Sequence, residues 1–212
     1  MSSGSAASLR LSIPGAAGSL EAVAADSSGF AVPSYGVLCH PHPLFGGTMD
    51  NKVVTTLAGA LQDAGIATLR FNFRGVGASS GAFDGGIGET ADAAAVAAYG
   101  ALRWPGRKLV LAGFSFGAYV ALRLALEQDA SRLITVAPPV GRFDFSALAP
   151  PNCPWLVIQG DADEIVDPAS VVAWVADLEP RPRLIVMPGV SHFFHGRLKE
   201  LKDAVGDAIR SG

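Results

Sequence analysis

Residues 113–117, which read Gly-Phe-Ser-Phe-Gly, constrain this chain more than any other segment. An apolar run at 109–112 precedes them and a helix-forming run at 118–124 follows. A side chain at either glycine would crowd a turn sharp enough to hold Ser115 in a strained backbone conformation. A turn of this kind between a strand and a helix lifts the hydroxyl above the sheet, as nucleophilic serines require. The alternative interpretation is an ordinary glycine-rich turn.

Apolar runs of strand length alternate with helix-like segments along most of the chain. The pattern predicts strands at 35–40, 66–71, 108–112, 133–137, 155–159 and 183–187, and helices at 51–64, 89–102, 115–126, 168–178 and 198–209. This alternation predicts an α/β fold with a mostly parallel central sheet and helices on both faces. Two further strand candidates, 9–13 and 20–25, flank Pro14-Gly15 and predict an antiparallel hairpin at one sheet edge.

Length and charge limit the classes of protein that fit. A chain of 212 residues, half of them hydrophobic, suits a single domain over residues 1–212 with a substantial core. The net charge of −3 and the scattered Lys and Arg residues argue against nucleic acid or an anionic membrane as a partner. No apolar run is long enough to span a bilayer, and the first residues lack the features of a signal peptide. We therefore expect a cytoplasmic protein.

Two cysteines are too few and too far apart to predict a disulfide framework or a zinc site. Cys39 ends an apolar run, which predicts a buried free thiol and not a catalytic one. A cytoplasmic location would also keep both Cys39 and Cys153 reduced.

A serine hydroxyl is a weak nucleophile until a base takes its proton. Among the four histidines, His192 follows the last predicted strand, in the kind of loop where a parallel sheet places its ligands. We predict His192 as the base, with His195, three residues further on, as the alternative.

A third group must orient the imidazole and stabilise its cation. Several acids follow the predicted strand 155–159, and three of them compete for this role. Asp167 precedes a proline and resembles a helix cap, and Asp161 follows a glycine and resembles a turn former. Asp163 is therefore predicted as the orienting acid. The chain order Ser, Asp, His is one of the known orders of such triads.

An oxyanion hole needs two N–H donors directed at the developing negative charge. The residue after the serine, Phe116, supplies one by its position. The second is expected from the loop 40–47, where Pro41 and Pro43 have no N–H to give. His42 is the first residue able to donate and Leu44 is the alternative.

At this point the chain resembles the α/β-hydrolase superfamily, and most of all its small, capless bacterial serine hydrolases, often grouped with the dienelactone hydrolase and acylaminoacyl-peptidase-like families. No single segment carries the resemblance, which rests on five in the family's order. They are His40-Pro41-His42-Pro43 with Gly46-Gly47, the segment 70–77, the segment 113–117, the segment 160–166 and Ser191-His192-Phe193.

The resemblance implies that Ser115 is the nucleophile, Asp163 the triad acid and His192 the base. The sequence departs from the family's pattern at Pro41, where relatives usually have glycine after the histidine. The identity of the second oxyanion donor therefore stays open. Residues 138–151 are too short for a helical lid, and an open cleft is expected. We predict Leu44, Phe45 and Phe194 as substrate-binding residues.

Two more aromatic residues, Phe83 and Phe143, are candidates for the rim of the cleft. For these two, and for Phe45 and Phe194, core packing is the alternative. Arg74 could attract an anionic acyl group or pair with a nearby acid.

The expected chemistry is hydrolysis of a carboxylic ester or thioester through an acyl-enzyme, without metal or cofactor. Two alternatives stay open. The pairs His40/His42 and His192/His195 have spacings seen in metal ligands. The fold also serves as a binding module where catalysis has been lost. An exposed edge strand could pair two chains in a homodimer.

Overall fold

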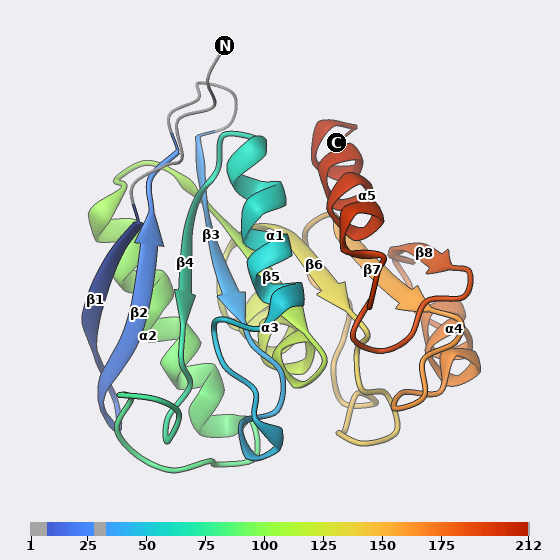
Figure 1. Ribbon diagram of the computed structural model, residues 1–212, viewed down its shortest axis with the longest axis horizontal. Coiled ribbons are helices and arrows are strands. Elements are labelled where there is room, and N and C mark those ends of the chain that lie inside the picture. Colours follow the sequence, from blue (N-terminus) through green and yellow to red (C-terminus); the bar gives the residue numbers. More distant parts are fainter. Residues whose placement is uncertain (1–7, 28–32, 212) are drawn as a thin grey trace.

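The computed structural model describes residues 8–27 and 33–211, and within them eight strands form one sheet (Figure 1). The strands run in the spatial order β1-β2-β4-β3-β5-β6-β7-β8. Both pairings of β2, with β1 and with β4, are antiparallel, and all the other neighbours are parallel. The bounds are β1 (Ser8–Gly15), β2 (Gly18–Ala25), β3 (Ser34–Cys39), β4 (Ala67–Phe71), β5 (Lys108–Phe114), β6 (Ala130–Val136), β7 (Trp155–Gly160) and β8 (Arg183–Met187).

Helices cover both faces of the sheet, as the sequence predicts. On one face, α1 and α5 enclose a core with β-strand side chains, and α2, α3 and α4 enclose a second core on the other (Figure 1). The helices are α1 (Lys52–Asp63), α2 (Ile87–Arg103), α3 (Phe116–Glu127), α4 (Pro168–Ala176) and α5 (Leu198–Arg210), with a short 3-10 helix η1 (Pro43–Phe45). Because β3 and β7 lie between the two layers, all their residues are buried.

Local chemistry explains where the helices begin. The Asp167 carboxylate accepts hydrogen bonds from the N–H groups of Ala169 and Ser170, which confirms the predicted cap of α4. Helix α2 begins two residues before the predicted start. Gly86 adopts a φ of 103° there, and buried Glu89 accepts its N–H from within the first turn. In the sequence, the pair Gly85-Gly86 followed by Glu89 was the signal for this helix start.

The carboxyl ends of the parallel strands meet at one edge of the sheet, at the bottom of Figure 1. The loops after β3, β5, β7 and β8 therefore lie where such sheets place ligands. Residues 137–154 leave β6 at this edge and reach the start of β7 at the opposite edge, and they contain no helix.

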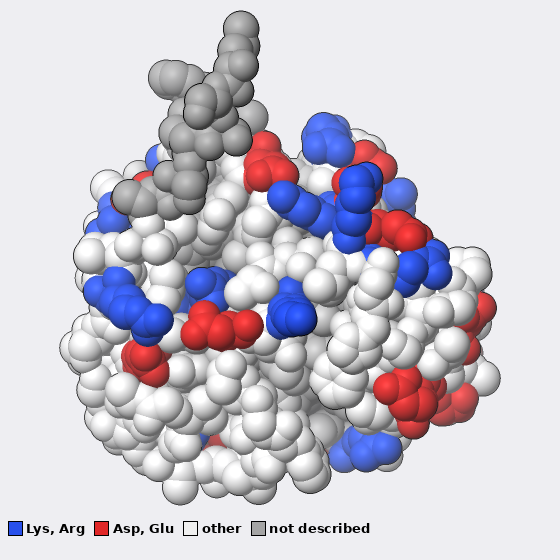
Figure 2. All heavy atoms as spheres, in the orientation of Figure 1, with Lys and Arg blue, Asp and Glu red and all other residues white. Residues whose placement is uncertain are grey.

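The charged side chains are distributed unevenly over the face seen in Figure 2. Many gather over α5, where they form ion pairs such as Lys199–Asp203 and Lys202–Asp63, and fewer lie toward the carboxyl edge of the sheet. Cys39 is a buried free thiol, as predicted, and Cys153 is also free. Within residues 8–27 and 33–211, no helix combines the length and apolar character needed to cross a bilayer.

Candidate active site

Ser115 occupies the sharp turn between β5 and α3. Its φ is 53°, in a region that few non-glycine residues adopt. A Cβ on Gly113 would lie 2.0 Å from the Gly117 carbonyl oxygen, and one on Gly117 would lie 2.2 Å from that of Cys39. Only hydrogen fits at either position, so both glycines are required for the turn.

The turn places Ser115 close to a histidine and an aspartate that belong to loops much later in the sequence. His192, after β8, lies with Nε2 3.2 Å from the Ser115 hydroxyl oxygen. Its Nδ1 lies 2.8 Å from the Oδ2 atom of Asp163, after β7. The carboxylate accepts, so Nδ1 carries the proton and Nε2 is free to accept from the serine. Ser115 is partly exposed, whereas His192 and Asp163 are buried.

The Asp163 carboxylate receives donors on both oxygens. Oδ1 accepts from the N–H groups of Ile165 and Val166, and Oδ2 accepts from Gln159 as well as from His192. Burial acts to raise the pKa of Asp163, but the hydrogen bonds from His192, Val166 and Ile165 outweigh it and hold the pKa below its usual range. The group is therefore an anion at neutral pH, able to stabilise an imidazolium.

Two neighbouring acids hold the loop that carries His192. Glu164 accepts the backbone N–H of His192 at 3.1 Å, and Asp161 accepts that of Gly189 at 2.6 Å. Asp161 thus braces a neighbouring loop instead of only forming a turn. Sequence reasoning assigned no role to Glu164, and the run of acids at 161–164 was its only signal.

The aromatic residues on either side of Ser115 support the site from both flanks. The ring of Phe114 lies 5.0 Å from that of His192 between centroids. Phe116 lies 5.1 Å from His42, whose ring also contacts Phe45, Phe83 and Phe143. Burial in this cluster lowers the pKa of His42, which favours its neutral form.

Two backbone N–H groups, those of Phe116 and His42, are expected to bind an oxyanion. Among the described residues, neither of them donates to a protein acceptor. The Leu44 N–H instead donates to the His42 ring at Nδ1, over 3.3 Å. His42 is therefore better placed than Leu44 as the second donor.

The remaining histidines do not gather around a metal site. Buried His40 donates from Nδ1 to the Pro41 carbonyl and accepts the Phe73 N–H at Nε2, so both of its ring nitrogens are engaged. His195 lies in a turn before α5 and is exposed. Nowhere in the described parts of the chain do three or more His, Cys, Asp or Glu side chains group as metal ligands.

Two adjoining cavities, of about 430 and 380 Å³, open at Ser115. Both are lined by His42, Phe45, Arg142 and Ile165 as well as the serine. Phe143 lines the smaller cavity, in agreement with its predicted place on the rim.

One of the three predicted substrate-binding residues is wrong. Phe194 is fully buried in the core beneath α5, with a φ of 54°, so it does not reach the cleft. Leu44 is 67% exposed and lines neither of these two cavities, so its role stays a prediction. Arg74 forms a two-pronged ion pair with buried Asp92, so it serves structure and not substrate.

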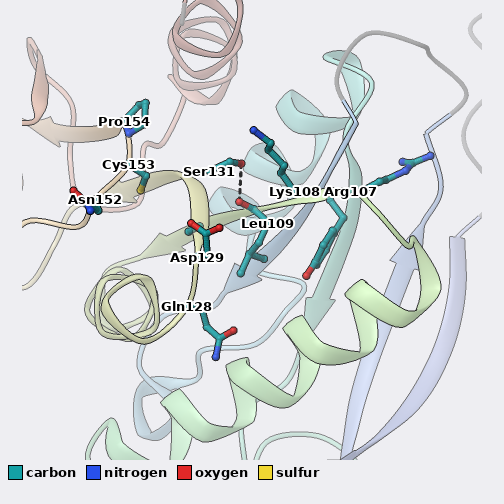
Figure 3. Close-up of a pocket in the computed structure, with 11 residues that line it drawn as sticks. Arg107, Lys108, Leu109, Gln128, Asp129, Ser131, Asn152, Cys153 and Pro154 are labelled. Carbon is teal, nitrogen blue, oxygen red and sulfur yellow. Dashed lines mark hydrogen bonds between the residues drawn. The ribbon is translucent and has the colours of Figure 1, made fainter.

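A third cavity, of about 460 Å³, lies at the opposite edge of the sheet (Figure 3). Its lining includes Arg107, Lys108, Asp129 and Cys153, and no histidine. The Ser131 hydroxyl there donates to the Leu109 carbonyl, and no histidine lines this cavity to act as its base. This cavity is larger than either of those at Ser115 but holds no such triad, so cavity volume alone does not identify the reactive site.

The sheet order, the strand–turn–helix at Ser115 and the uncovered carboxyl edge define an α/β hydrolase without a lid. A family model described as serine aminopeptidase, S33, matches residues 44–151. The chain belongs to this family of the α/β-hydrolase superfamily.

Individual relatives agree with this assignment. A crystal structure of an α/β serine hydrolase without lid from Xanthomonas campestris is 48% identical, with a TM-score of 0.93, and the match covers 96% of this chain and 94% of that one. An α/β serine hydrolase homologue from Coxiella burnetii is 46% identical, with a TM-score of 0.91 and coverage of 94% and 96%. An uncharacterized protein of Rickettsia prowazekii is 37% identical over 188 residues, 82% of this chain and 77% of that protein.

Proposed function

We propose that the protein hydrolyses carboxylic esters or thioesters through a triad of Ser115, His192 and Asp163. The geometry that carries this proposal is the continuous chain of hydrogen bonds from the Ser115 hydroxyl through the His192 imidazole to the Asp163 carboxylate. The Ser115 end of this chain lies in the wall of a cavity large enough to hold a small ester. Two similar serine hydrolase structures, one of them described as lacking a lid, support the same chemistry.

In the first half-reaction, the Ser115 oxygen attacks the carbonyl carbon while His192 Nε2 takes the hydroxyl proton. The carbonyl oxygen becomes an anion, which the N–H groups of Phe116 and His42 stabilise together with the positive end of α3. The bond to the alcohol or thiol then breaks, and His192 gives its proton to the leaving group. The acyl group stays on Ser115.

In the second half-reaction, His192 takes a proton from water, and the resulting hydroxide attacks the acyl-enzyme. Collapse of the second anion releases the carboxylic acid and returns the proton to Ser115. Asp163 stays ionised throughout and stabilises the imidazolium. The scheme requires no cofactor.

The Ser115→Ala variant tests this proposal. We expect its hydrolysis of short p-nitrophenyl esters and thioesters to fall by about a thousandfold or more, because the attacking atom is gone. Labelling by a fluorophosphonate probe should also disappear. Circular dichroism supplies the control for folding. Parental rates in the pure variant would refute the assignment, and a parent that folds but neither labels nor hydrolyses would support a binding module.

A further inference from the structure

One cationic side chain lies in the wall of the site and plays no part in the proposed chemistry. Arg142 lines both cavities at Ser115, and among the described residues no other Lys, Arg, Asp or Glu lines either of them. The surrounding wall is mainly apolar or aromatic, formed by residues such as Phe45, Ile165 and Phe193. A single charge in an otherwise apolar wall fixes the orientation of a ligand of opposite sign.

The structure holds Arg142 at two points. Its backbone N–H donates to the Pro139 carbonyl over 3.1 Å, which closes a turn in the connection between β6 and β7. Its Nη2 donates to the Ile165 carbonyl over 2.8 Å, across the cavity wall. The guanidinium is therefore oriented before a ligand arrives, which reduces the entropy lost on binding.

No acid in the described part of the chain neutralises the charge of Arg142. Among the described residues, no carboxylate forms an ion pair with it, in contrast to Arg74, which two acids surround. The contact with Ile165 is its one side-chain hydrogen bond in that part of the chain. A guanidinium has five N–H donors in a fork that matches a carboxylate, so donors are left for a ligand.

We propose that Arg142 selects esters that carry a carboxylate on the part of the molecule remote from the scissile bond. The inference rests on the proposed function, since it names the substrate class of the same site. The scissile carbonyl lies at Ser115, an apolar spacer contacts the wall formed by Phe45 and Ile165, and the distal carboxylate pairs with Arg142. Neutral esters of the same length are held through their apolar spacer alone.

The test compares two pairs of substrates. The mono-4-nitrophenyl esters of adipic and suberic acid carry a distal carboxylate, and the 4-nitrophenyl esters of hexanoic and octanoic acid are neutral and of equal chain length. The quantity measured is the ratio of kcat/KM for the acidic ester to that for its neutral match. We expect the parent to prefer the acidic ester, through a lower KM.

Three variants make the test specific. In Arg142→Gln the ratio should fall about threefold to tenfold, the size of one partly exposed ion pair. Arg142→Lys keeps the charge and should retain part of the preference. Arg107→Gln removes an equal charge at the opposite edge of the sheet and should leave the ratio unchanged. Added salt should reduce the ratio in the parent but not in Arg142→Gln.

The outcomes separate the inference from the function on which it rests. A parent that hydrolyses both esters through Ser115 with the same ratio as Arg142→Gln would refute the role of Arg142 and leave the proposed function intact. An equal fall in kcat/KM for the acidic and the neutral ester in Arg142→Gln would mean that the residue only supports the loop through its bond to Ile165. That result would also refute the proposed selectivity. Failure of the folded parent to hydrolyse any of the four esters would overturn the proposed function and the inference together.

Discussion

Glu164 shows how a residue outside the reacting group can hold the site together. Its carboxylate accepts the backbone N–H of His192, the residue whose ring must lie within reach of Ser115. This bond, together with that from Gly189 to Asp161, joins the loop after β8 to the loop after β7, which carry the histidine and its orienting acid. We consider Glu164 a positioning residue.

We expect Glu164→Ala to lower kcat about fivefold with little change in KM, because a loosened His192 spends less time aligned with Ser115. This corresponds to a net hydrogen bond of about 1 kcal/mol. Glu164→Gln keeps an oxygen that can accept the same N–H and should recover most of the rate. Steady-state kinetics on a short p-nitrophenyl ester measures both. Equal losses in the two variants would mean that the hydrogen bond is not what matters.

At the scale of the element, the unit β5–Ser115–α3 depends on backbone contacts with β3. The Cβ that Gly117 lacks would lie 2.2 Å from the Cys39 carbonyl oxygen and 2.6 Å from that of His40. Both atoms belong to the backbone of the central sheet or its exit, so they cannot move aside cheaply. Helix α3 would have to shift away from the sheet.

We therefore expect Gly117→Ala to lower the free energy of unfolding by about 1–3 kcal/mol, the usual cost of overpacking a core. The matched control is Gly59→Ala in α1, where the new Cβ meets only the end of the Lys202 side chain at 3.6 Å. That substitution should raise the free energy of unfolding by about 0.5–1 kcal/mol, because alanine favours a helix. Urea unfolding of the two variants, changing in opposite directions, checks the argument. A Gly117→Ala variant as stable as the parent would contradict it.

Most elements were predictable because their signals are local. Apolar runs and helical spacing placed the strands and helices, and the alternation of the two predicted the mostly parallel sheet. The spatial strand order follows from contacts between distant segments and was not predicted. The same distinction holds in the site, where Ser115, Asp163 and His192 were chosen from their places after strands. The contacts of Arg142 and Glu164 cross between loops, and no sequence pattern marks them.

Phe194 illustrates a choice that the sequence alone leaves open. Its predicted place was the rim of the cleft, with core packing as the alternative. Its positive φ instead sends the side chain into the core between α5 and the sheet. No residue type signals that conformation in advance, since phenylalanine rarely adopts it.

At the scale of the whole molecule, His40 makes stability depend on pH. Burial lowers the pKa of His40 to about 4, although the hydrogen bond to the Pro41 carbonyl opposes the shift. The unfolded chain, with an ordinary histidine pKa, takes up a proton below about pH 6.5 while the folded protein does not until about pH 4. Stability from neutral His40 is thus complete above pH 6.5 and is lost as the pH falls toward 4.

Over that range we expect His40 to account for a loss of about 3 kcal/mol in the free energy of unfolding. His40→Gln keeps an acceptor for the Phe73 N–H but cannot titrate, so its stability should fall less steeply between pH 6.5 and 4. Urea unfolding at pH 7, 5.5 and 4.5 measures both slopes. Identical slopes for the parent and the variant would show that His40 is not the group responsible.

The bare connection between β6 and β7 has a consequence for how this hydrolase discriminates. Among the described residues no lid segment covers Ser115, so we expect a substrate to meet walls already in place, without selection by a closing motion. We expect selectivity to depend on the side chains that line the two cavities, such as Phe45, Arg142, Ile165 and Phe193. Divergence in substrate range among relatives of this shape would then proceed by single replacements at such positions, with no gain or loss of a covering segment.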